Sequence, residues 1–147
     1  MLALLQRVNY ATVTVANKIV GQIDRGILVF VGVEPNDTQI VANKMSHRII
    51  NYRLFADRDD RMNLSVQDIN GAVMLVPQFT LAADTKKGMR PSFTTAAAPE
   101  HGKKIFTYML LVIKEAAHTD INVQSGEFGA NMQVTLCNDG PATFLLT

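Results

Sequence analysis

The stretch from residue 10 to 33, "YATVTVANKIVGQIDRGILVFVGV", decides the fold class of this 147-residue chain. Ala11 and Val13 alternate with threonines, which is the period of a strand that buries one face. Asn17-Lys18 predicts a turn, so residues 19–23 are expected to return as the second strand of a hairpin. The apolar run "ILVFVGV" that follows is typical of a strand buried on both faces. We therefore expect the chain to open with three strands, antiparallel at least in part.

Two amphipathic helices are predicted further along the chain. In residues 35–55 the apolar stripe of the first helix comprises Ile40, Val41, Met45, Ile49 and Ile50. We expect Asn36 or Asp37 to cap its first turn. The second helix should begin at Pro99, because the fixed backbone angle of proline suits a first helical position. Its apolar stripe comprises Ile105, Tyr108, Met109, Val112, Ile113 and Ala116.

The remaining segments are expected to be extended. Residues 71–83, "GAVMLVPQFTLAA", predict another buried strand, and residues 121–138 and 142–147 predict a broken extended segment and a closing strand. The order of elements is then strands, helix, strand, helix, strands. This order favours one compact α/β domain with a mixed sheet, and a chain of this length is expected to form a single domain, residues 1–147.

Composition narrows the functional classes. The net charge of +1 gives no general attraction to nucleic acid or to anionic membranes, so a nucleic-acid partner would need a local basic patch. Cys137 is the only cysteine, which excludes an internal disulfide and fits a reducing compartment. The start of the chain alternates like a strand and does not resemble a signal peptide, and no apolar run is long enough to span a bilayer. We therefore expect a cytoplasmic protein without a membrane partner.

Metal and nucleophile motifs are not apparent. The three histidines and Cys137 are far apart in sequence, without the close spacing of zinc ligands. There is no G-x-S-x-G elbow and no glycine-rich phosphate loop. The sequence predicts no metal site and no cofactor.

The stretch "VPQFTLAADTKKGMRPSF", residues 76–93, combines two features that suit chemistry. Pro77 lacks a ladder donor, so the strand is expected to bulge or to lie at a sheet edge there. Gln78, Thr80 and nearby backbone amides would then reach the surface, where they could stabilise an oxyanion. The basic residues that follow could contact phosphates: Lys86, Lys87 and Arg90. A structural strand end and an ordinary solvated loop remain alternatives.

The C-terminal stretch "QVTLCNDGPATFLLT", residues 133–147, raises a further question. A strand-like run stops at residues 138–141 and resumes at once. Gly140-Pro141 is either an ordinary tight turn or a backbone element that takes part in chemistry.

Taken together, these segments resemble the bacterial-type D-aminoacyl-tRNA deacylases, also called D-tyrosyl-tRNA deacylases, along essentially the whole chain. The similarity lies in "LALLQRV…ATVTV", "NYRLFAD…RMNLSV", "QFTLAADTKKGMRPSF" and "FGANMQVTLCNDGPATF". The Ser-Gln-Phe-Thr-Leu motif of that family is similar to residues 77–81, and its Asn-x-Gly-Pro-Val-Thr motif to residues 138–143. Two positions depart from the family pattern: Pro77 stands in place of Ser, and Ala142 in place of Val.

The resemblance implies a barrel-like, largely antiparallel mixed sheet with two main helices. It also implies a homodimer that hydrolyses the ester joining a D-amino acid, or glycine, to the 3′ end of tRNA. In this family the Gly-Pro peptide is cis and enters the partner subunit's active site, where its carbonyls bind the substrate's amino group. Gly140 and Pro141 would then form a stereochemical filter that excludes L side chains by a backbone clash.

The resemblance also implies roles for the other motif residues. Gln78 and Phe79 would contact the oxyanion, mainly through the main chain, and Thr80 would orient the substrate or act as the nucleophile. The attacking group would be activated by the 2′-hydroxyl of the terminal adenosine. Phe79 and Met132 are candidate walls for the adenine, with core packing as the alternative for Met132.

Lys86, Lys87 and Arg90 are the corresponding candidates for the tRNA acceptor backbone. Two rival functions stay open: hydrolysis of another acyl ester, and a tRNA- or DNA-binding module that has lost activity, which Pro77 makes conceivable.

Overall fold

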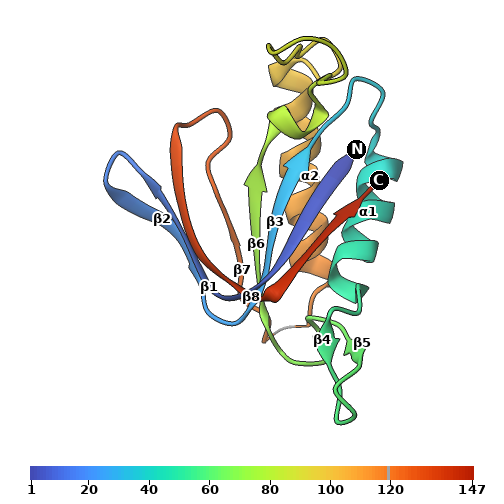
Figure 1. Cartoon of the computed structure of the whole chain (residues 1–147), viewed down its shortest axis with the longest axis vertical. Coiled ribbons are helices and arrows are strands. Elements are labelled where there is room, and N and C mark those ends of the chain that lie inside the picture. Colours follow the sequence, from blue (N-terminus) through green and yellow to red (C-terminus); the bar gives the residue numbers. More distant parts are fainter. Residues whose placement is uncertain (119) are drawn as a thin grey trace.

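The predicted opening hairpin is present in the computed structural model, which describes residues 1–118 and 120–147 (Figure 1). Strand β1 (Leu2–Val15) pairs antiparallel with β2 (Lys18–Ile23) and with β3 (Gly26–Gly32). Ala16 and Asn17 form the turn, both with positive φ angles of 47° and 63°. The three expected strands are therefore confirmed.

The other strands extend this sheet on both sides. β3 runs parallel to β6 (Ala72–Pro77), and β6 runs parallel to β7 (Val123–Ser125). On the opposite edge, β8 (Met132–Leu146) lies antiparallel to nearly the whole length of β1. A separate hairpin consists of β4 (Phe55–Ala56) and β5 (Met62–Leu64). The main sheet is mixed and largely antiparallel, as expected.

The sheet curls towards a barrel because β2 bends over β7. A Cβ atom on Gly21 of β2 would lie only 2.9 Å from the carbonyl oxygen of Ser125 in β7. This approach leaves no room for a side chain, so glycine is required at the position. The prediction of one compact α/β domain with a barrel-like sheet and two helices is confirmed.

Both main helices cover the same face of the sheet (Figure 1). Helix α1 spans Gln39–Asn51 and α2 spans Pro99–Ala116, with proline in the first turn as predicted. The expected cap of α1 was wrong, because Thr38 is the N-cap and its hydroxyl accepts from the amide of Val41 at 3.4 Å. Asn36 and Asp37 precede this position.

The helical stripes are largely as predicted, with two errors. Met45, Ile49 and Ile50 of α1 are buried, whereas Ile40 is 67% exposed. On α2, Ala116 is exposed, and Phe106 instead joins the buried face. Both wrongly assigned residues lie at helix ends: Ile40 is in the first turn of α1, and Ala116 is the last residue of α2.

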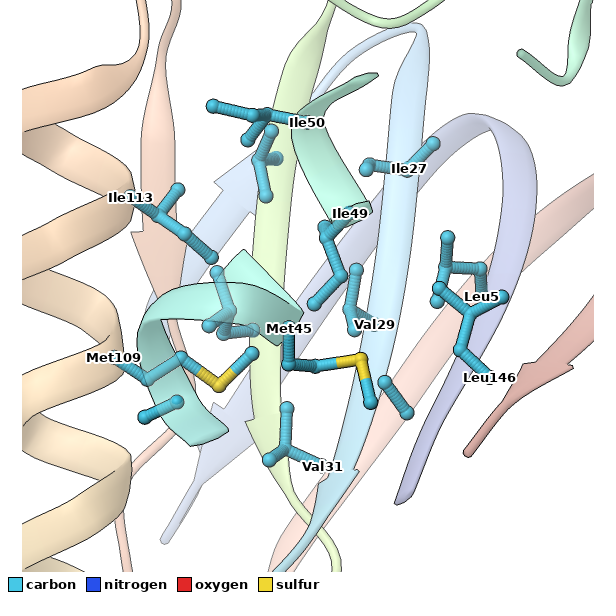
Figure 2. Packing of buried hydrophobic residues seen from close by; sticks show 14 of the residues in the cluster. Leu5, Ile27, Val29, Val31, Met45, Ile49, Ile50, Met109, Ile113 and Leu146 are labelled. Carbon is cyan, nitrogen blue, oxygen red and sulfur yellow. The ribbon is translucent and has the colours of Figure 1, made fainter. Parts of the chain in front are cut away.

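Two hydrophobic clusters fill the molecule, one on each face of the sheet. Figure 2 shows the cluster between the sheet and the helices, where Met45 and Ile49 of α1 meet Val29 of β3. The other cluster lies inside the curl and includes Val8, Leu28 and Met74. A register irregularity in β1 between Val8 and Tyr10 shifts the alternation by one residue, so Ala11 and Val13 also join this inner cluster.

The strand predicted over residues 71–83 was too long. β6 ends at Pro77, and a 3₁₀ helix, η1 (Phe79–Ala82), follows directly. Pro77 lies neither at a bulge nor on an edge strand. The amide of Val73 donates to the carbonyl of Asn122, directly before β7, whereas the amide of Gln78 donates to the carbonyl of Val31 in β3 at 2.8 Å. By this alternation the missing donor of Pro77 faces the β7 side, where pairing ends at Ser125, so no ladder hydrogen bond is lost.

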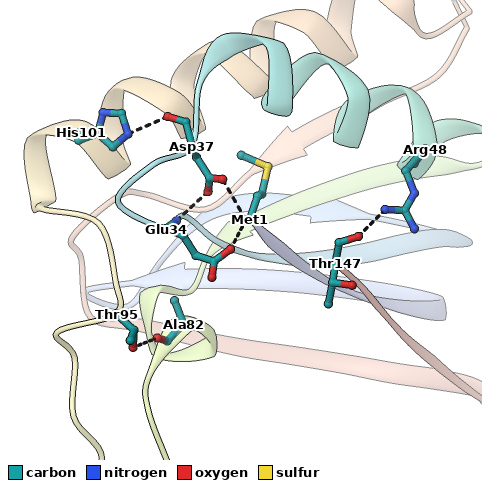
Figure 3. A network of polar contacts seen from close by, with 8 residues as sticks. All are labelled: Met1, Glu34, Asp37, Arg48, Ala82, Thr95, His101 and Thr147. Carbon is teal, nitrogen blue, oxygen red and sulfur yellow. Dashed lines mark hydrogen bonds and ion pairs between the residues drawn. The ribbon is translucent and has the colours of Figure 1, made fainter.

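A polar network joins the residue before β1 to the segment before α1 and to α2 (Figure 3). The amino group of Met1 forms ion pairs with Glu34 and Asp37. The backbone carbonyl of Asp37 also bonds a ring nitrogen of His101 on α2 at 2.9 Å. Burial disfavours the charged amine, yet the hydrogen bonds that it donates to Glu34 and Asp37 outweigh this effect and raise the pKa of the Met1 amine above its ordinary value of 8.0. Among the described residues, no helix is both long and apolar enough to cross a membrane.

Candidate active site

The turn that follows β6 presents two unpaired backbone donors. Gln78 leaves the strand with φ −141° and ψ 76°, and the chain then enters η1. The first carbonyls of the turn are used: Leu81 donates to Gln78 at 3.1 Å, and Ala83 donates to Thr80 at 3.2 Å. Across the described part of the chain, the amides of Phe79 and Thr80 donate to no protein acceptor. Two adjacent free amides on an exposed turn are suitable donors for an oxyanion.

The side chains of this turn are accessible to solvent, and contacts with neighbouring side chains hold them in position. Thr80 is exposed, and its hydroxyl accepts a hydrogen bond from the side-chain amide of Gln78. Phe79 is 54% exposed and packs edge to face on Phe93, with ring centroids 5.1 Å apart. The three predicted residues of this motif therefore lie together on one surface.

Two adjoining pockets open beside this turn. The first has a volume of about 210 Å³ and lies between η1 and the start of α2, where Pro99, Gly102 and Phe106 line it. The second has a volume of about 260 Å³ and extends along β6 and β8, where Pro77 and Met132 line it. The residues common to both pockets are Gln78, Phe79, Phe128 and Gly129. Phe79 and Met132, predicted to share one pocket, both line the second.

Phe128 is a site residue that the sequence reasoning missed. Its ring lies between the two pockets and packs on Phe106, with centroids 6.2 Å apart. The stretch "GEFGA" around it does not match a glycine-rich phosphate loop, so the sequence motifs gave Phe128 no role. An aromatic residue flanked by glycines is itself a usable signal, since such a loop presents the ring without a surrounding strand or helix.

The predicted basic residues lie on a loop beyond η1. Asp84 and Ser92 close this loop through two backbone hydrogen bonds of 2.8 and 3.0 Å. The cations are all exposed, and none forms an ion pair with a described residue: Lys86, Lys87 and Arg90. Phe93, just after the loop, contacts Phe79, so the loop is attached to the candidate site.

The Gly140-Pro141 segment does not interrupt a strand, contrary to the expected break. β8 continues from Met132 to Leu146, and a wide bulge forms within it. Thr143 pairs with Gln6 and Asn138 pairs with Val8, so four residues of β8 stand opposite Arg7 alone. The Gly140-Pro141 peptide is cis, Gly140 has φ 126°, and both residues are exposed.

Arg7 holds this bulge, and the sequence reasoning missed it as well. Its Nε donates to the carbonyl of Asp139 at 3.1 Å and lies 3.2 Å from the carboxylate of the same residue. Its Nη1 donates to the carbonyl of Leu54 at 2.8 Å. The available signal was one arginine within the apolar strand "LALLQRV", where a charge must find partners.

Asn138 and Thr143 brace the bulge across its base. The side-chain oxygen of Asn138 accepts from the amide of Ala142 at 3.0 Å, and its nitrogen donates to Thr143 at 2.9 Å. Ala142, which departs from the family pattern, is buried between them with 4% exposure. The hydrogen bonds of Asn138 and Thr143 thus hold the shape of the bulge, although Thr143 itself is exposed.

Within one chain, the two predicted motifs do not meet. Arg7 pairs with Ile27, and Ile27 pairs with Val73, near the start of β6. Gln78 lies five residues further along β6, which corresponds to about 16 Å at 3.3 Å per residue. Gly140 and Pro141 therefore lie near the opposite end of the sheet from Gln78 and Thr80. In the described residues, no group of three or more His, Cys, Asp or Glu side chains could hold a metal ion.

Comparison with known proteins connects these features to one family. The family model described as D-Tyr-tRNA(Tyr) deacylase matches residues 4–147. A D-aminoacyl-tRNA deacylase of Pseudomonas fluorescens (strain Pf0-1) is 56% identical over 146 residues, covering 99% of each chain. One of Pseudoalteromonas translucida (strain TAC 125) is 51% identical over the same coverage.

Solved structures show the same fold. The structure titled c-Myc DNA Unwinding Element Binding Protein superposes with a TM-score of 0.94 at 35% identity, covering 100% of this chain and 98% of the other. A probable eukaryotic D-amino acid tRNA deacylase superposes with a TM-score of 0.84 at 16% identity, covering 99% of this chain and 97% of the other.

Proposed function

This chain belongs to the D-Tyr-tRNA(Tyr) deacylase family, and we propose that it hydrolyses the ester bond between a D-amino acid and the 3′ end of tRNA. Its activity is that of a D-aminoacyl-tRNA deacylase. The observation that supports the ester chemistry is the pair of free amides at Phe79 and Thr80, on an exposed turn beside two pockets. The products are a free D-amino acid and a tRNA that can be charged again.

The proposed mechanism relies on backbone donors and on the substrate itself. The amide of Gln78, predicted to contact the oxyanion together with that of Phe79, instead donates to Val31. The amides of Phe79 and Thr80 therefore stabilise the negative charge on the ester carbonyl as the tetrahedral intermediate forms. The side-chain amide of Gln78 fixes the hydroxyl of Thr80. That partner is a donor and cannot remove the hydroxyl proton, which favours an orienting role for Thr80 over a nucleophilic one. The 2′-hydroxyl of the terminal adenosine then activates the attacking group.

The proposed stereochemical filter comes from a second copy of the chain. Because Gly140 and Pro141 lie about 16 Å from Gln78 along the sheet, one chain cannot bring its own filter to its own η1 turn. In a homodimer, the exposed bulge of one protomer can enter the site of the other. Its backbone would bind the amino group of the substrate and leave no space for an L side chain, whereas glycine and D residues fit.

The pockets support a site for the terminal adenosine. Phe79 and Met132 line the second pocket, which offers an apolar surface on which a base can stack. We propose these residues as walls of the adenosine site. The acceptor backbone is then contacted by the exposed cations Lys86, Lys87 and Arg90. Since tRNA is charged and used in the cytoplasm, we propose that the protein acts there. The proposed reaction needs no cofactor.

The test is a side-by-side measurement of deacylation of D-Tyr-tRNA and L-Tyr-tRNA by the purified protein. We expect rapid loss of the D ester, rapid loss of glycyl-tRNA, and an L ester that decays at the uncatalysed rate. Equal hydrolysis of the D and L esters would leave the esterase and refute the filter. Binding of tRNA without hydrolysis of any ester would instead favour the binding-module alternative, with Pro77 as the first residue to revert to serine.

A further inference from the structure

The positive charge of this chain is concentrated in one continuous segment. Residues 84–104 contain five Lys and Arg and two Asp and Glu, which gives this segment a net charge of +3. Since the whole chain has a net charge of +1, the other 126 residues together carry −2. The segment comprises the basic loop, the connection through Phe93, and the first turns of α2. The first turn of α2 lines the first pocket through Pro99 and Gly102, whereas the basic loop lines none of it and is attached beside it through the contact of Phe93 with Phe79.

The α2 side of this segment carries two lysines directly after a pocket residue. Gly102 lines the first pocket, and Lys103 and Lys104 follow it with exposed side chains. Neither lysine forms an ion pair with a described residue, and Glu100 in the first turn does not neutralise them. Both positive charges remain available to a ligand.

Helical geometry separates the two lysines. Successive residues are rotated by about 100°, so Lys103 is displaced only about 60° from Phe106, whose ring packs on Phe128 at the pocket. On the other flank, His101 is bonded to the carbonyl of Asp37 in the segment before α1. Lys104 is rotated about 200° from Gly102 and faces away from the pocket. Lys103 is therefore the lysine of α2 on the pocket side.

We propose that Lys103 contacts a backbone phosphate of the single-stranded 3′ end of tRNA where this strand leaves the first pocket. The strand passes between the basic loop on one side and the first turns of α2 on the other. This inference rests on the proposed function, because it assumes that the 3′ end of a tRNA occupies the pockets. The sequence predicted phosphate contacts from the basic loop alone, and Lys103 adds a contact from α2.

The chain contains a matched control for this contact. Lys114 is an exposed lysine in the last turn of α2. It points within about 20° of the direction of Lys103 but lies about 16 Å further along the helix axis, beyond reach of the pocket. Replacing either lysine by alanine removes one exposed charge from the same helix, so only the position differs.

The experiment measures kcat/KM for D-Tyr-tRNA over a range of salt concentrations for the wild-type protein, Lys103→Ala and Lys114→Ala. We expect Lys103→Ala to lower kcat/KM by roughly two- to fivefold at low salt. The salt dependence should become shallower by about 0.7 in the log–log slope, as for the loss of one contact to a single strand. Lys103→Arg should restore both values, and Lys114→Ala should match the wild type.

A second substrate separates a phosphate contact from a structural effect. D-tyrosyl-adenosine carries the ester and the base but no downstream phosphate, so Lys103→Ala should hydrolyse it at the wild-type rate. Equal losses on both substrates would overturn the proposal, as would indistinguishable behaviour of Lys103→Ala and Lys114→Ala. If the wild-type protein hydrolyses neither substrate, the proposed function fails, and binding of uncharged tRNA by the same variants then tests the surface alone. Unchanged binding by Lys103→Ala would overturn the inference.

Discussion

Arg7 connects segments that are 47 and 132 residues away from it in sequence. Its guanidinium joins the carbonyl of Leu54 to the bulge at Asp139, and its side chain is only 14% exposed. A Cβ atom on Gly140 would lie 2.7 Å from Nη2 of Arg7, so the arginine also occupies the space beside the glycine. Arg7 thus fixes the proposed filter together with the hydrogen bonds of Asn138.

Arg7→Ala should therefore damage both stability and activity. The loss of charged hydrogen bonds to two carbonyls should lower the free energy of unfolding by about 2 kcal/mol. Displacement of the bulge should lower kcat/KM for D-Tyr-tRNA by about a hundredfold, because catalysis is sensitive to small misplacements. Urea denaturation and deacylation assays measure the two effects. Arg7→Lys is the control, since it keeps the charge without the two-sided geometry, and full activity in Arg7→Ala would contradict the assigned role.

Thr80→Ala distinguishes the two roles considered for this residue. If Thr80 orients the substrate, its loss should reduce kcat/KM by less than about tenfold, the value of one hydrogen bond. If it were the nucleophile, the loss should be roughly 10⁴-fold or greater. Single-turnover deacylation of D-Tyr-tRNA gives the answer, and Thr80→Ser controls for the hydroxyl itself. We expect the smaller effect, because the hydroxyl already accepts a bond from Gln78.

At the scale of elements, the β4–β5 hairpin depends on one carboxylate. Asp57 accepts hydrogen bonds from the side chain of Asn63 and from the amides of Arg61 and Asp59. The bond from Asn63 is the largest cause that lowers the pKa of Asp57 below 3.8, followed by the backbone bond from Arg61. Because the folded-state pKa of Asp57 is lowered, its carboxylate stabilises the hairpin fully at pH values above the unfolded-state pKa. This stabilisation decreases as the pH falls through the folded-state pKa.

We therefore expect the hairpin to lose order below about pH 3.8 while the main sheet persists. This transition is measured by NMR from pH 6 to pH 2, using the backbone amide signal of Arg61 and the side-chain amide signals of Asn63. Asp57→Asn should show the acid spectrum of the hairpin already at neutral pH. Retention of the Asn63 contact in that variant would show that the charge of Asp57 is not required.

The elements that could be predicted from the sequence are those whose pattern is local. The hairpin around Asn17 and the helix beginning at Pro99 both follow from residues that are neighbours in sequence. The end of β6 at Pro77 could not be placed, because it depends on where β7 stops pairing. The bulge in β8 could not be predicted either, because it depends on pairing with β1, which lies more than 130 residues earlier in sequence. Phe79 and Met132 were predicted to share a pocket, whereas Phe128 and Arg7 emerged only from the fold.

At the scale of the whole molecule, the proposed active site requires two chains. Phe79→Asp should disable the turn of its own protomer, and Gly140→Val should disable the bulge, because a side chain there meets Arg7 and the φ of 126° disfavours it. Each variant alone should be inactive. A one-to-one mixture, after subunit exchange, should regain about a quarter of the wild-type activity, since half of the dimers carry one intact site of two.

Deacylation of D-Tyr-tRNA by the mixture, compared with each parent at the same total concentration, measures this recovery. A doubly substituted chain, mixed with wild type, is the control for subunit exchange. If the mixture stays as inactive as its parents while exchange is demonstrated, each site must be formed by a single chain, and the dimer proposal would have to be abandoned.

The pairing of β1 with β8 also has a consequence for the synthesis of the protein. Residues 2–15 are translated more than a hundred codons before their partner strand, residues 132–146. One edge of β1 therefore stays unpaired while the residues between the two strands are translated, and the nascent chain must remain protected from aggregation during that time. The bulge held by Arg7 can form only after residues 132–146 have also left the ribosome. The filter is thus among the last features of the molecule to assemble.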